Sequence, residues 1–544
     1  MTMAATAGGG VRSGGMTAEE RKVIFASSLG TVFEWYDFYI YGTLGVFLAK
    51  YFFSNVPPAV GFIFALLAFA AGFAVRPFGA LIFGRLGDMI GRKYTFLITM
   101  SLMGVGTFFI GLLPGYATWG LAAPIVLIAL RLVQGLALGG EYGGAAIYVA
   151  EHAPKNKRGY YTSWIQTTAT LGLFMALLLI LGIRSLMGED SFGSWGWRIP
   201  FLASGILLII SIWIRLSLNE SPVFQRMKDE GKTSRRPLTE AFGEWRHAKI
   251  AILALLGATA GEAVVWYGGQ FYALFFLTQT LKVPAVPAQI MIVMALLLGT
   301  PFFVLFGWLS DKIGRKPIVL AGFLLAALTY FPIFKGITHF ANPRLEAALA
   351  SAPVTVIADP SECSFQFKAT GTETFTTGCD IAKSALVNLS VNYTNQDAPK
   401  GTPAQVKVGD QTLTATATDF AKSLAAAIKN HGYPATADPN EINHVMTTLL
   451  LWLLVIYVTL VYAPIAAWLV ELFPSRIRYS GMSLPYHIGN GWFGGFLPAT
   501  VFAIVAATGN IYSGLWYPVG IAVMSLIIGF LFLPETKDVD ITKT

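Results

Sequence analysis

The sequence predicts an all-α membrane protein built from two related six-helix bundles, with a small α+β domain inserted outside the membrane. Three observations predict this fold class. The 544 residues are 55% hydrophobic and 12% charged, with a mean hydropathy of +0.60, whereas soluble proteins carry about 25% charged residues. A charged motif at 84–93 recurs at 307–316, each time between apolar segments. One long polar stretch, 339–443, has no apolar run of membrane-spanning length.

Both copies of the motif read Gly-x-Leu-x-Asp-x-x-Gly-Arg-Lys, and we expect each to be a loop between two helices. The glycines permit turning and close helix approach, and the aspartate can cap a neighbouring helix. The motifs are therefore predicted to be a conformational gate; the alternative is that their basic residues only fix topology. The shared residues are Gly84, Asp88, Gly91, Arg92 and Lys93 in the first copy, and Gly307, Asp311, Gly314, Arg315 and Lys316 in the second.

A helix that crosses a bilayer needs about 20 apolar residues, and twelve segments qualify. They lie at roughly 23–49, 59–83, 94–113, 121–150, 159–183, 198–218, 249–278, 288–310, 317–338, 444–470, 480–507 and 514–533.

The distribution of Lys and Arg predicts the orientation of these helices. Basic residues gather in the connections on the side of the two motifs, whereas the opposite loops 114–120 and 508–513 contain none. Because basic loops stay inside, both termini are expected in the cytoplasm of a bacterial inner membrane. The same pattern explains the net charge of +8 without nucleic-acid binding. The predicted divisions are a disordered N-terminus 1–22, a first bundle 23–218, a linker 219–248, helices 7–9 in 249–338, a periplasmic insert 339–443, helices 10–12 in 444–533 and a tail 534–544.

The insert is predicted to contain strands at 353–357, 364–367 and 405–416 and a helix at 418–430. Both cysteines of the chain, Cys363 and Cys379, fall within it. Because the far face of a bacterial inner membrane is oxidising, we expect a disulfide between them. The alternative is two unpaired thiols.

The repeated motif resembles the signature of the major facilitator superfamily, where it joins helices 2 and 3 and again helices 8 and 9. Within that superfamily the chain is similar to the metabolite:proton symporters, a branch that includes permeases for α-ketoglutarate, shikimate and proline/betaine. The insert and the lack of a long C-terminal coiled coil are departures. The further segments that carry the resemblance are 34–39, 76–79, 131–135, 139–143, 220–222 and 534–537.

Helices 1 and 4 place ionisable residues deep in the membrane, where each costs about 2.5–3.5 kcal/mol to insert. Asp37 and Arg131 are expected at similar depth, so a substrate carboxylate that takes over Arg131 would leave Asp37 free to accept a proton. The alternative is a permanent ion pair that holds the two helices together. Glu34 shares the face of Asp37, and Glu141 is a second candidate proton site or a structural hydrogen-bond partner.

The remaining candidate substrate contacts are aromatic, amide and acidic side chains, some on helices 1, 4 and 7, which line the cavity in the family that the chain resembles, and others on helices 5 and 11. An aromatic stripe also fits simple helix packing, and His487 also fits a hydrogen-bonded structural role. Arg76 is expected to reach back to the membrane surface. The candidates are Tyr41, Gln134, Tyr142, Gln166, Glu262, Trp266, Tyr267, Gln270, His487 and Asn490, together with Arg131.

The sequence therefore predicts a proton-coupled symporter, not an enzyme, that imports a small organic acid by alternating access. We expect a monomer in the lipid bilayer whose coupling ion is the proton, with no other cofactor, no metal and no nucleic acid. A proton-driven exporter, a symporter of zwitterionic osmolytes and a receptor that uses the insert remain alternatives. The substrate itself stays open.

Overall fold

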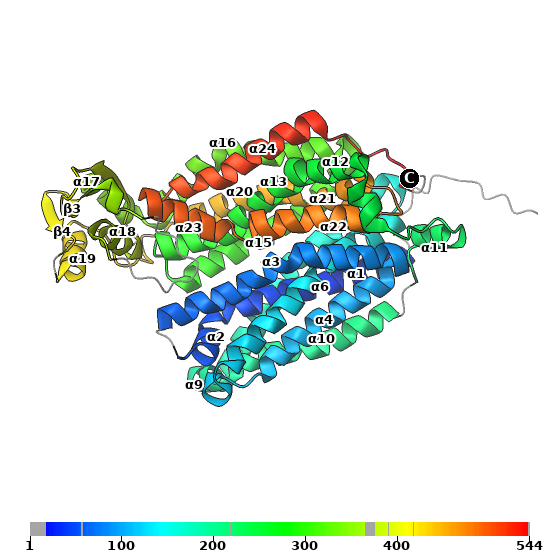
Figure 1. The fold of residues 1–544 in the computed structure, drawn as a ribbon, viewed down its shortest axis with the longest axis horizontal. Coiled ribbons are helices and arrows are strands. Elements are labelled where there is room, and N and C mark those ends of the chain that lie inside the picture. The colour runs from blue at the N-terminus through cyan, green and yellow to red at the C-terminus, as the bar shows by residue number, and fades with distance from the viewer. Residues whose placement is uncertain are drawn as a thin grey trace, which may run out of the picture.

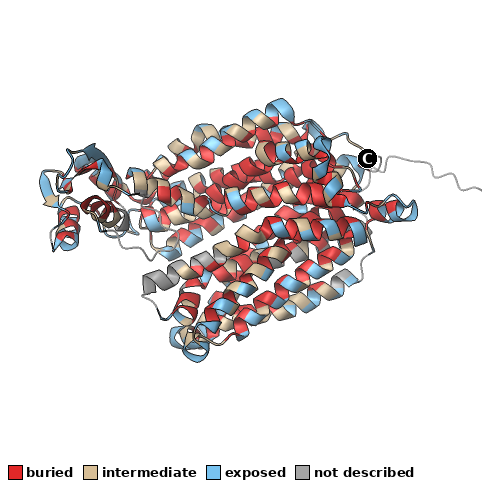
Figure 2. Cartoon of the chain, viewed as in Figure 1, coloured by how far each residue is buried: buried red, intermediate tan, exposed pale blue. Residues whose placement is uncertain are grey.

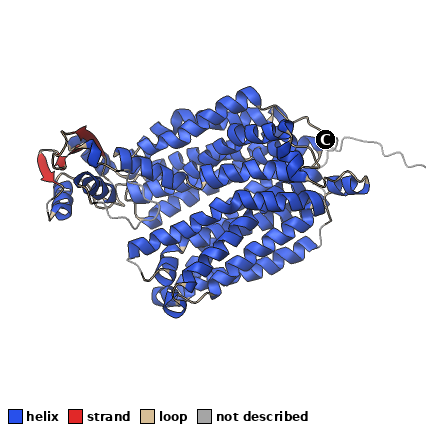
Figure 3. Cartoon of the chain, viewed as in Figure 1, coloured by secondary structure: helices blue, strands red, loops and turns tan. Residues whose placement is uncertain are grey.

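Two helical bundles lie side by side, and a small domain projects from one end of the second bundle (Figures 1 and 3). The computed structural model describes residues 18–55, 58–216, 219–364, 376–389, 391–416 and 418–541. The predicted disorder of 1–22 falls largely outside these residues, but Ala18 already begins the first helix. We call the end with the small domain the insert end, and the end with the two signature motifs the motif end.

The first bundle contains the first six long helices and several short ones. Its elements are α1 (Ala18–Thr43), α2 (Gly45–Phe52), α3 (Pro58–Ile90), α4 (Arg92–Leu112), α5 (Tyr116–Trp119), α6 (Ala122–His152), η1 (Lys155–Lys157), α7 (Arg158–Gln166), α8 (Thr168–Met187), α9 (Glu189–Ser194), η2 (Gly196–Arg198) and α10 (Ile199–Leu216). The linker that follows is itself partly helical, with α11 (Pro222–Asp229) and η3 (Thr239–Gly243).

The second bundle repeats the plan, with the insert between its third and fourth long helices. Its seventh span changes between α-helical and wider π-helical turns, a feature that often marks functional positions. The elements are α12 (Trp245–Ala254), η4 (Leu255–Thr259), α13 (Ala260–Tyr267), η5 (Gly268–Tyr272), α14 (Ala273–Phe275), η6 (Phe276–Thr280), α15 (Ala285–Ile313), α16 (Arg315–Ala341), α20 (His444–Tyr462), α21 (Ile465–Leu472), α22 (Arg478–Ile488), η8 (Gly489–Gly494), α23 (Leu497–Thr508), η9 (Ser513–Leu515) and α24 (Trp516–Phe532).

The helices have the length and surface of membrane-spanning segments. Among the described residues, 10 helical stretches are long and apolar enough to cross a bilayer, and α1 and α3 complete the twelve. Buried residues run along the inside of the body, and exposed ones along its outer faces (Figure 2). Large apolar side chains such as Leu186 (88% exposed) and Ile209 (70%) point outward. Because a bilayer offers the backbone no hydrogen-bond partners, helices satisfy it internally.

Glycines bring the second and fourth long helices together. A Cβ at Gly135 would collide with the backbone of Gly72, and one at Gly139 would collide with the backbone of Arg76. Small residues at such crossings let two membrane helices approach to backbone contact. This contact between α3 and α6 fixes the depth of the polar groups that both helices carry.

The signature motifs are not the ten-residue loops that the sequence suggested. Most of each motif continues a helix, α3 to Ile90 and α15 to Ile313, and a single glycine separates that helix from the next. Gly91 has φ 121° and Gly314 has φ 114°, a conformation that side chains other than glycine rarely adopt. The chain therefore reverses on one residue, so α3 and α15 run deeper toward the motif end than predicted.

The insert is a four-stranded sheet with three helices. The strand order is β2-β1-β3-β4, with β1 (Val354–Ala358) parallel to β2 (Tyr393–Asp397) and the β3 (Gln405–Val408) and β4 (Gln411–Thr414) hairpin antiparallel to it. The helices are α17 (Pro343–Ser351), α18 (Gly378–Asn388) and α19 (Phe420–Asn430), and η7 (Pro360–Glu362) is one short turn.

Part of the insert was predicted correctly. The strand at 353–357 and the helix at 418–430 correspond to β1 and α19, and the run 405–416 is a hairpin. The predicted strand at 364–367 is wrong at Ser364, which lies in no strand, and its other residues lie outside the described part. The elements α17, α18 and β2 were not predicted, because their mixed composition carries no strong periodicity.

The described contacts of the insert join it to the second bundle. The backbone N–H of Tyr393 donates to Gly509 O (2.8 Å), and that of Ala437 donates to Lys282 O (3.0 Å). The Asn392 side chain accepts from Ile511 N at 2.9 Å. Buried side chains of the insert continue the apolar core of the second bundle. The insert is therefore anchored to two loops at the insert end of that bundle.

Cys363 and Cys379 form a disulfide, with Cα atoms 5.2 Å apart and a sequence separation of 16. We expect the double substitution Cys363→Ser, Cys379→Ser to destabilise the insert by about 3 kcal/mol, the loop-closure contribution of a loop of that size. Thermal proteolysis of the full-length protein, with and without reductant, measures this. The insert should be cleaved at a lower temperature in the variant and in the reduced protein alike, and an unchanged cleavage midpoint would refute the prediction.

Candidate functional site

A buried ion pair lies in the middle of the first bundle. Arg131 Nη1 of α6 lies 3.0 Å from Asp37 Oδ2 of α1. Gln134 accepts from Arg131 (2.8 Å) and donates to Asp37 Oδ1 (3.1 Å). Thr107 of α4 donates to the same oxygen at 2.7 Å. Asp37 and Arg131 are each 3% exposed, and their contact shows that they lie at the same depth, as predicted.

Aromatic rings lie next to this pair. The Arg131 guanidinium lies 4.3 Å from the centre of the Tyr41 ring, an attractive cation–π distance. Phe38, next to Asp37, contacts Phe73 of α3. Such surroundings strengthen the electrostatic attraction, but they make an unpaired charge costly. A ligand that separates Asp37 from Arg131 must therefore replace what each group loses.

Two residues of this site were not predicted in it. Thr107 is a lone hydroxyl in an apolar helix, and nothing in the sequence relates it to Asp37. Arg76 was expected at the membrane surface, but it is 7% exposed and lines a small cavity with Asp37 and Arg131. The reason is the length of α3, because its end at Ile90 puts Arg76 about 20 Å inside at 1.5 Å per residue.

The other predicted residues of the first bundle are distributed along its inner face. Tyr142 accepts a hydrogen bond from Gln166 at 2.8 Å and stacks on Tyr486 of the second bundle at 3.8 Å. Glu141 is wholly buried in α6. The side chain of Glu34 lies outside the described part of the structure.

The second bundle contributes a separate polar group at the boundary between the bundles. Asn490 of η8 donates to Glu262 Oε2 of α13 at 2.9 Å. Trp266 stacks on Trp35 of the first bundle at 4.8 Å, Tyr267 packs edge-on against Phe73, and Gln270 is buried. The expected hydrogen bond of His487 is not observed, because neither ring nitrogen has a partner among the described residues.

At the motif end, the first signature motif binds the second bundle. Asp88 accepts hydrogen bonds from the backbone N–H groups of Tyr479 (3.1 Å) and Ser480 (2.8 Å), in the first turn of α22. Arg92 donates to Ser475 O at 2.7 Å. The carboxylate meets the positive end of the helix dipole, so the predicted capping role matches the geometry.

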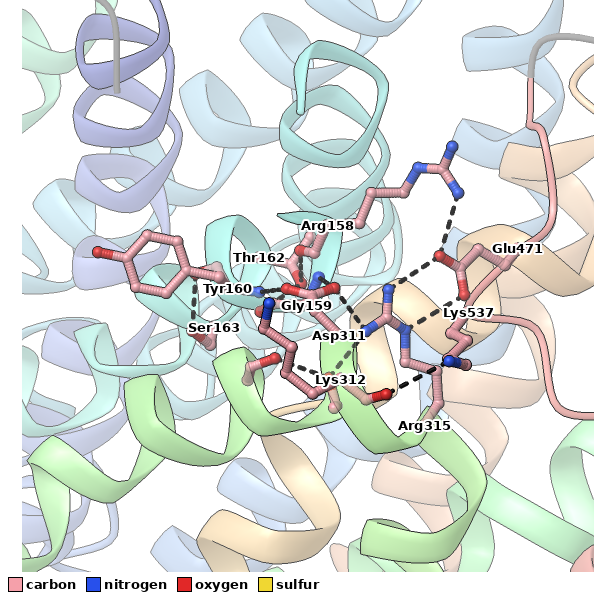
Figure 4. Close-up of polar contacts among 12 residues, drawn as sticks. Arg158, Gly159, Tyr160, Thr162, Ser163, Asp311, Lys312, Arg315, Glu471 and Lys537 are labelled. Carbon is pink, nitrogen blue, oxygen red and sulfur yellow. Dashed lines mark hydrogen bonds and ion pairs between the residues drawn. The ribbon is translucent and has the colours of Figure 1, made fainter. Parts of the chain in front are cut away.

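The second motif makes the reciprocal contacts (Figure 4). Asp311 accepts from the backbone N–H groups of Gly159 (2.9 Å) and Tyr160 (2.8 Å) in the first turn of α7. Arg315 pairs with Asp311 at 2.6 Å and with Glu471 at 3.2 Å. Each motif therefore caps a helix of the opposite bundle.

Two glutamates complete this arrangement, and the sequence reading missed both. Glu151, at the end of α6, pairs with Arg478 of the second bundle at 2.7 Å. Glu471, at the end of α21, pairs with Arg158 of the first bundle at 3.1 Å (Figure 4). Glu151 and Glu471 occupy equivalent positions in the two halves, and a search for repeated residues beyond the motifs could have identified both. Four carboxylates thus join the bundles at the motif end.

Glu220 and Glu535 each bind the first turn of the helix that follows a motif glycine. Glu220 accepts from the backbone N–H of Lys93 at 3.2 Å, and Glu535 accepts from those of Arg315 and Lys316 at 3.0 Å each. The two motif lysines also close helix ends, since Lys93 donates to Leu216 O and Lys316 to Phe530 O. These contacts explain the acidic residues after the sixth and twelfth long helices.

Two pseudo-equivalent bundles that meet at a buried polar centre are the architecture of a secondary membrane transporter. Comparison with known proteins supports this class, because the sugar (and other) transporter family matches residues 22–255 and 420–544. The chain belongs to this family, within the major facilitator superfamily. It is a multi-pass membrane transporter and not an enzyme.

Similar proteins share this description. The shikimate transporter of Escherichia coli is 37% identical over 320 residues, 58% of this chain and 72% of that protein. A putative metabolite transport protein of Haemophilus influenzae is 33% identical over 532 residues, 95% of each chain. For the proline/betaine transporter of Salmonella typhimurium, at 36% identity, the match spans 58% of this chain and 64% of the relative.

Solved structures confirm the fold. The proton:xylose symporter XylE, bound to 6-bromo-6-deoxy-D-glucose, superposes with a TM-score of 0.61 at 16% identity, covering 96% of this chain and 98% of that one. The partially occluded, inward-open form of XylE from E. coli gives 0.58, again at 16% identity and covering 96% and 99%.

The capping contacts predict how the two motifs control opening at the motif end. Asp88→Asn keeps one acceptor oxygen but loses the charge that meets the helix dipole, which costs about 1 kcal/mol and shifts the ratio of closed to open states about fivefold. Asp311→Asn should act equally, because its geometry is equivalent. Labelling of single engineered cysteines at the two ends measures the populations.

The matched control is Asp229→Asn, an exposed residue of the linker, which should leave the labelling unchanged. Equal labelling in Asp88→Asn, Asp311→Asn and the control would show that the caps do not hold this end closed.

Proposed function

We propose that this protein is a proton-coupled symporter that imports a small organic acid across a bacterial inner membrane. The motif end then faces the cytoplasm, with both chain termini, and the insert lies in the periplasm. The concentration of basic residues at the motif end supports this orientation. In that orientation the carboxylate contacts of the two motifs close the cytoplasmic side.

The observation that carries the proposal is the buried Asp37–Arg131 pair beside Arg76. These three residues line one small cavity, and they bring two positive charges and one negative charge. A guanidinium such as that of Arg131 binds a carboxylate through two parallel hydrogen bonds. The names of similar proteins, among them a shikimate transporter and an α-ketoglutarate permease, point the same way.

Coupling follows from competition for Arg131. When a substrate carboxylate binds this guanidinium, Asp37 loses its counter-charge while it remains buried. A buried carboxylate without a cation favours its protonated form. Thr107 and Gln134 remain as hydrogen-bond partners of Asp37 Oδ1. Proton and acid are therefore taken up together and released together when the cytoplasmic side opens.

All the groups in this scheme come from one chain, so we place the whole transport cycle in a monomer. Alternating access requires the cytoplasmic contacts to break as contacts at the insert end form. The insert moves together with the second bundle, because its described contacts are with loops of that bundle. The proton is the coupling ion in this proposal, and no other cofactor enters it.

Asp37→Asn tests the coupling. Its amide cannot take up a proton, so accumulation driven by an imposed pH gradient should fall to the level seen without the gradient. Exchange of labelled acid at equal pH should persist, because Arg131 still binds it. Reconstituted vesicles with an entrapped pH dye and a panel of small carboxylates measure both.

The matched control is Asp190→Asn, an exposed residue near the insert end, which should transport as the unmodified protein does. Gradient-driven accumulation by Asp37→Asn at the control rate would refute the role of this carboxylate.

A further inference from the structure

Several buried polar atoms of the second bundle have no hydrogen-bond partner within the described part of the chain. They include Glu262 Oε1, Trp266 Nε1, Gln270 Oε1 and both ring nitrogens of His487. The four side chains are between 0% and 4% exposed. Native proteins pair nearly all their buried polar atoms, so a group of unpaired ones in a single region points to a ligand.

Glu262 is the strongest member of this group. Asn490 satisfies one of its oxygens at 2.9 Å, and no donor of the described residues reaches the other. No cation forms a salt bridge with it there. A buried carboxylate in this state is costly, and packing alone gives no reason to keep one.

These side chains lie where the two bundles meet. Trp266, one helical turn from Glu262, stacks on Trp35 of the first bundle at 4.8 Å. Tyr486, one turn from Asn490, stacks on Tyr142 at 3.8 Å. Alternating access separates this boundary, so the unpaired atoms become reachable from the cavity during the cycle.

The same boundary leads to the acid-binding side of the first bundle. Arg76, which lines the cavity with Asp37, packs against the helix turn that follows Asn490. A Cβ at Gly491 would lie 3.8 Å from Arg76 Cβ. Arg76 and Arg131 therefore lie on one side of the boundary between the bundles, and Glu262 lies on the other.

We propose that Glu262, with Gln270 and Asn490, is the subsite for the end of the substrate opposite its carboxylate, and that this end carries a hydroxyl or ammonium group. The inference rests on the proposed function and adds the substrate class. The unpaired oxygen of Gln270 is an acceptor, and Glu262 accepts once it is ionised, a form that an ammonium group of the ligand stabilises. A second carboxylate would offer no donor to Gln270 Oε1 and no cation to Glu262. The substrate is thus a hydroxy acid or an amino acid rather than a dicarboxylate.

Binding to the purified full-length protein tests the subsite with two matched series. One consists of butyrate, 4-hydroxybutyrate, 4-aminobutyrate and succinate. The other is cyclohexanecarboxylate with its 4-hydroxy and 4-amino derivatives. Calorimetry should show at least one donor-bearing acid binding more than tenfold tighter than its parent and than succinate. The hydroxyl and amino arms distinguish the two kinds of donor.

Glu262→Gln should remove most of the advantage of an amino acid, by tenfold or more, and less of that of a hydroxy acid, which an amide still accepts. Glu230→Gln, an exposed linker residue, is the matched control and should leave the ranking intact. If Glu262→Gln does not fold, the ranking by the unmodified protein still decides.

Equal affinities within each series, a preference for succinate, or no binding by any donor-bearing acid would overturn the subsite. Proton-driven uptake of butyrate or succinate that Asp37→Asn abolishes would leave the proposed symport standing without it. Absence of any proton-driven acid uptake would instead reject the symport itself.

Discussion

The contact between Asp37 and Arg131 is the interaction on which the rest of the site depends. Two charges lie almost fully buried inside the first bundle, and each is tolerable only while the other is present. Thr107 and Gln134 hold the carboxylate in place, so the pair has one geometry rather than many. In the proposed coupling, a ligand that takes Arg131 from Asp37 leaves a buried carboxylate that a proton neutralises.

The contacts at the motif end are the second constraint, and they follow from the internal repeat. Asp88 caps a helix of the second bundle, and Asp311 caps a helix of the first, with closely similar distances. Glu151 and Glu471 repeat the relation with arginines of the opposite bundle. These four carboxylate contacts form two equivalent pairs, so the two halves contribute equally to holding this end closed. We expect the closed end to behave as a switch between two states.

The described contacts of the insert join it to the second bundle, at the end opposite this switch. Its sheet and helices continue the apolar core of the second bundle, and Lys282 and Gly509 anchor it through backbone hydrogen bonds. Lys282 has φ 54°, the sole positive φ at a non-glycine position in the described chain. The end of the seventh span is thus held in a specific conformation where it forms the hydrogen bond with the insert.

The sequence was sufficient for the two-bundle plan, because hydrophobic length and a repeated motif are local signals. It also placed Asp37 and Arg131 at one depth, since residue counting along helices is reliable near their centres. It failed at helix ends. Charged residues at 84–90 stay helical at the membrane surface, so composition gave no sign that α3 continues to Ile90. Because the predicted helix ended too early, Arg76 was expected at the membrane surface rather than in the site.

Partners far apart in sequence were also beyond prediction. Thr107 is an ordinary hydroxyl until Asp37 is placed 2.7 Å away. Glu151 and Arg478 are separated by 327 positions, and neither carries a pattern that names the other. Within the insert, α18 and β2 depend on packing against neighbours rather than on their own periodicity. Tertiary contacts therefore supplied what local patterns could not.

The most direct test of the central claim counts protons on binding. Purified protein in weak buffer with a pH indicator is titrated with the acid that binds most tightly. The account predicts that about one proton is taken up for each bound acid molecule, because Asp37 is neutralised when Arg131 changes partner. Binding without any proton uptake, at any pH between 6 and 8, would contradict it.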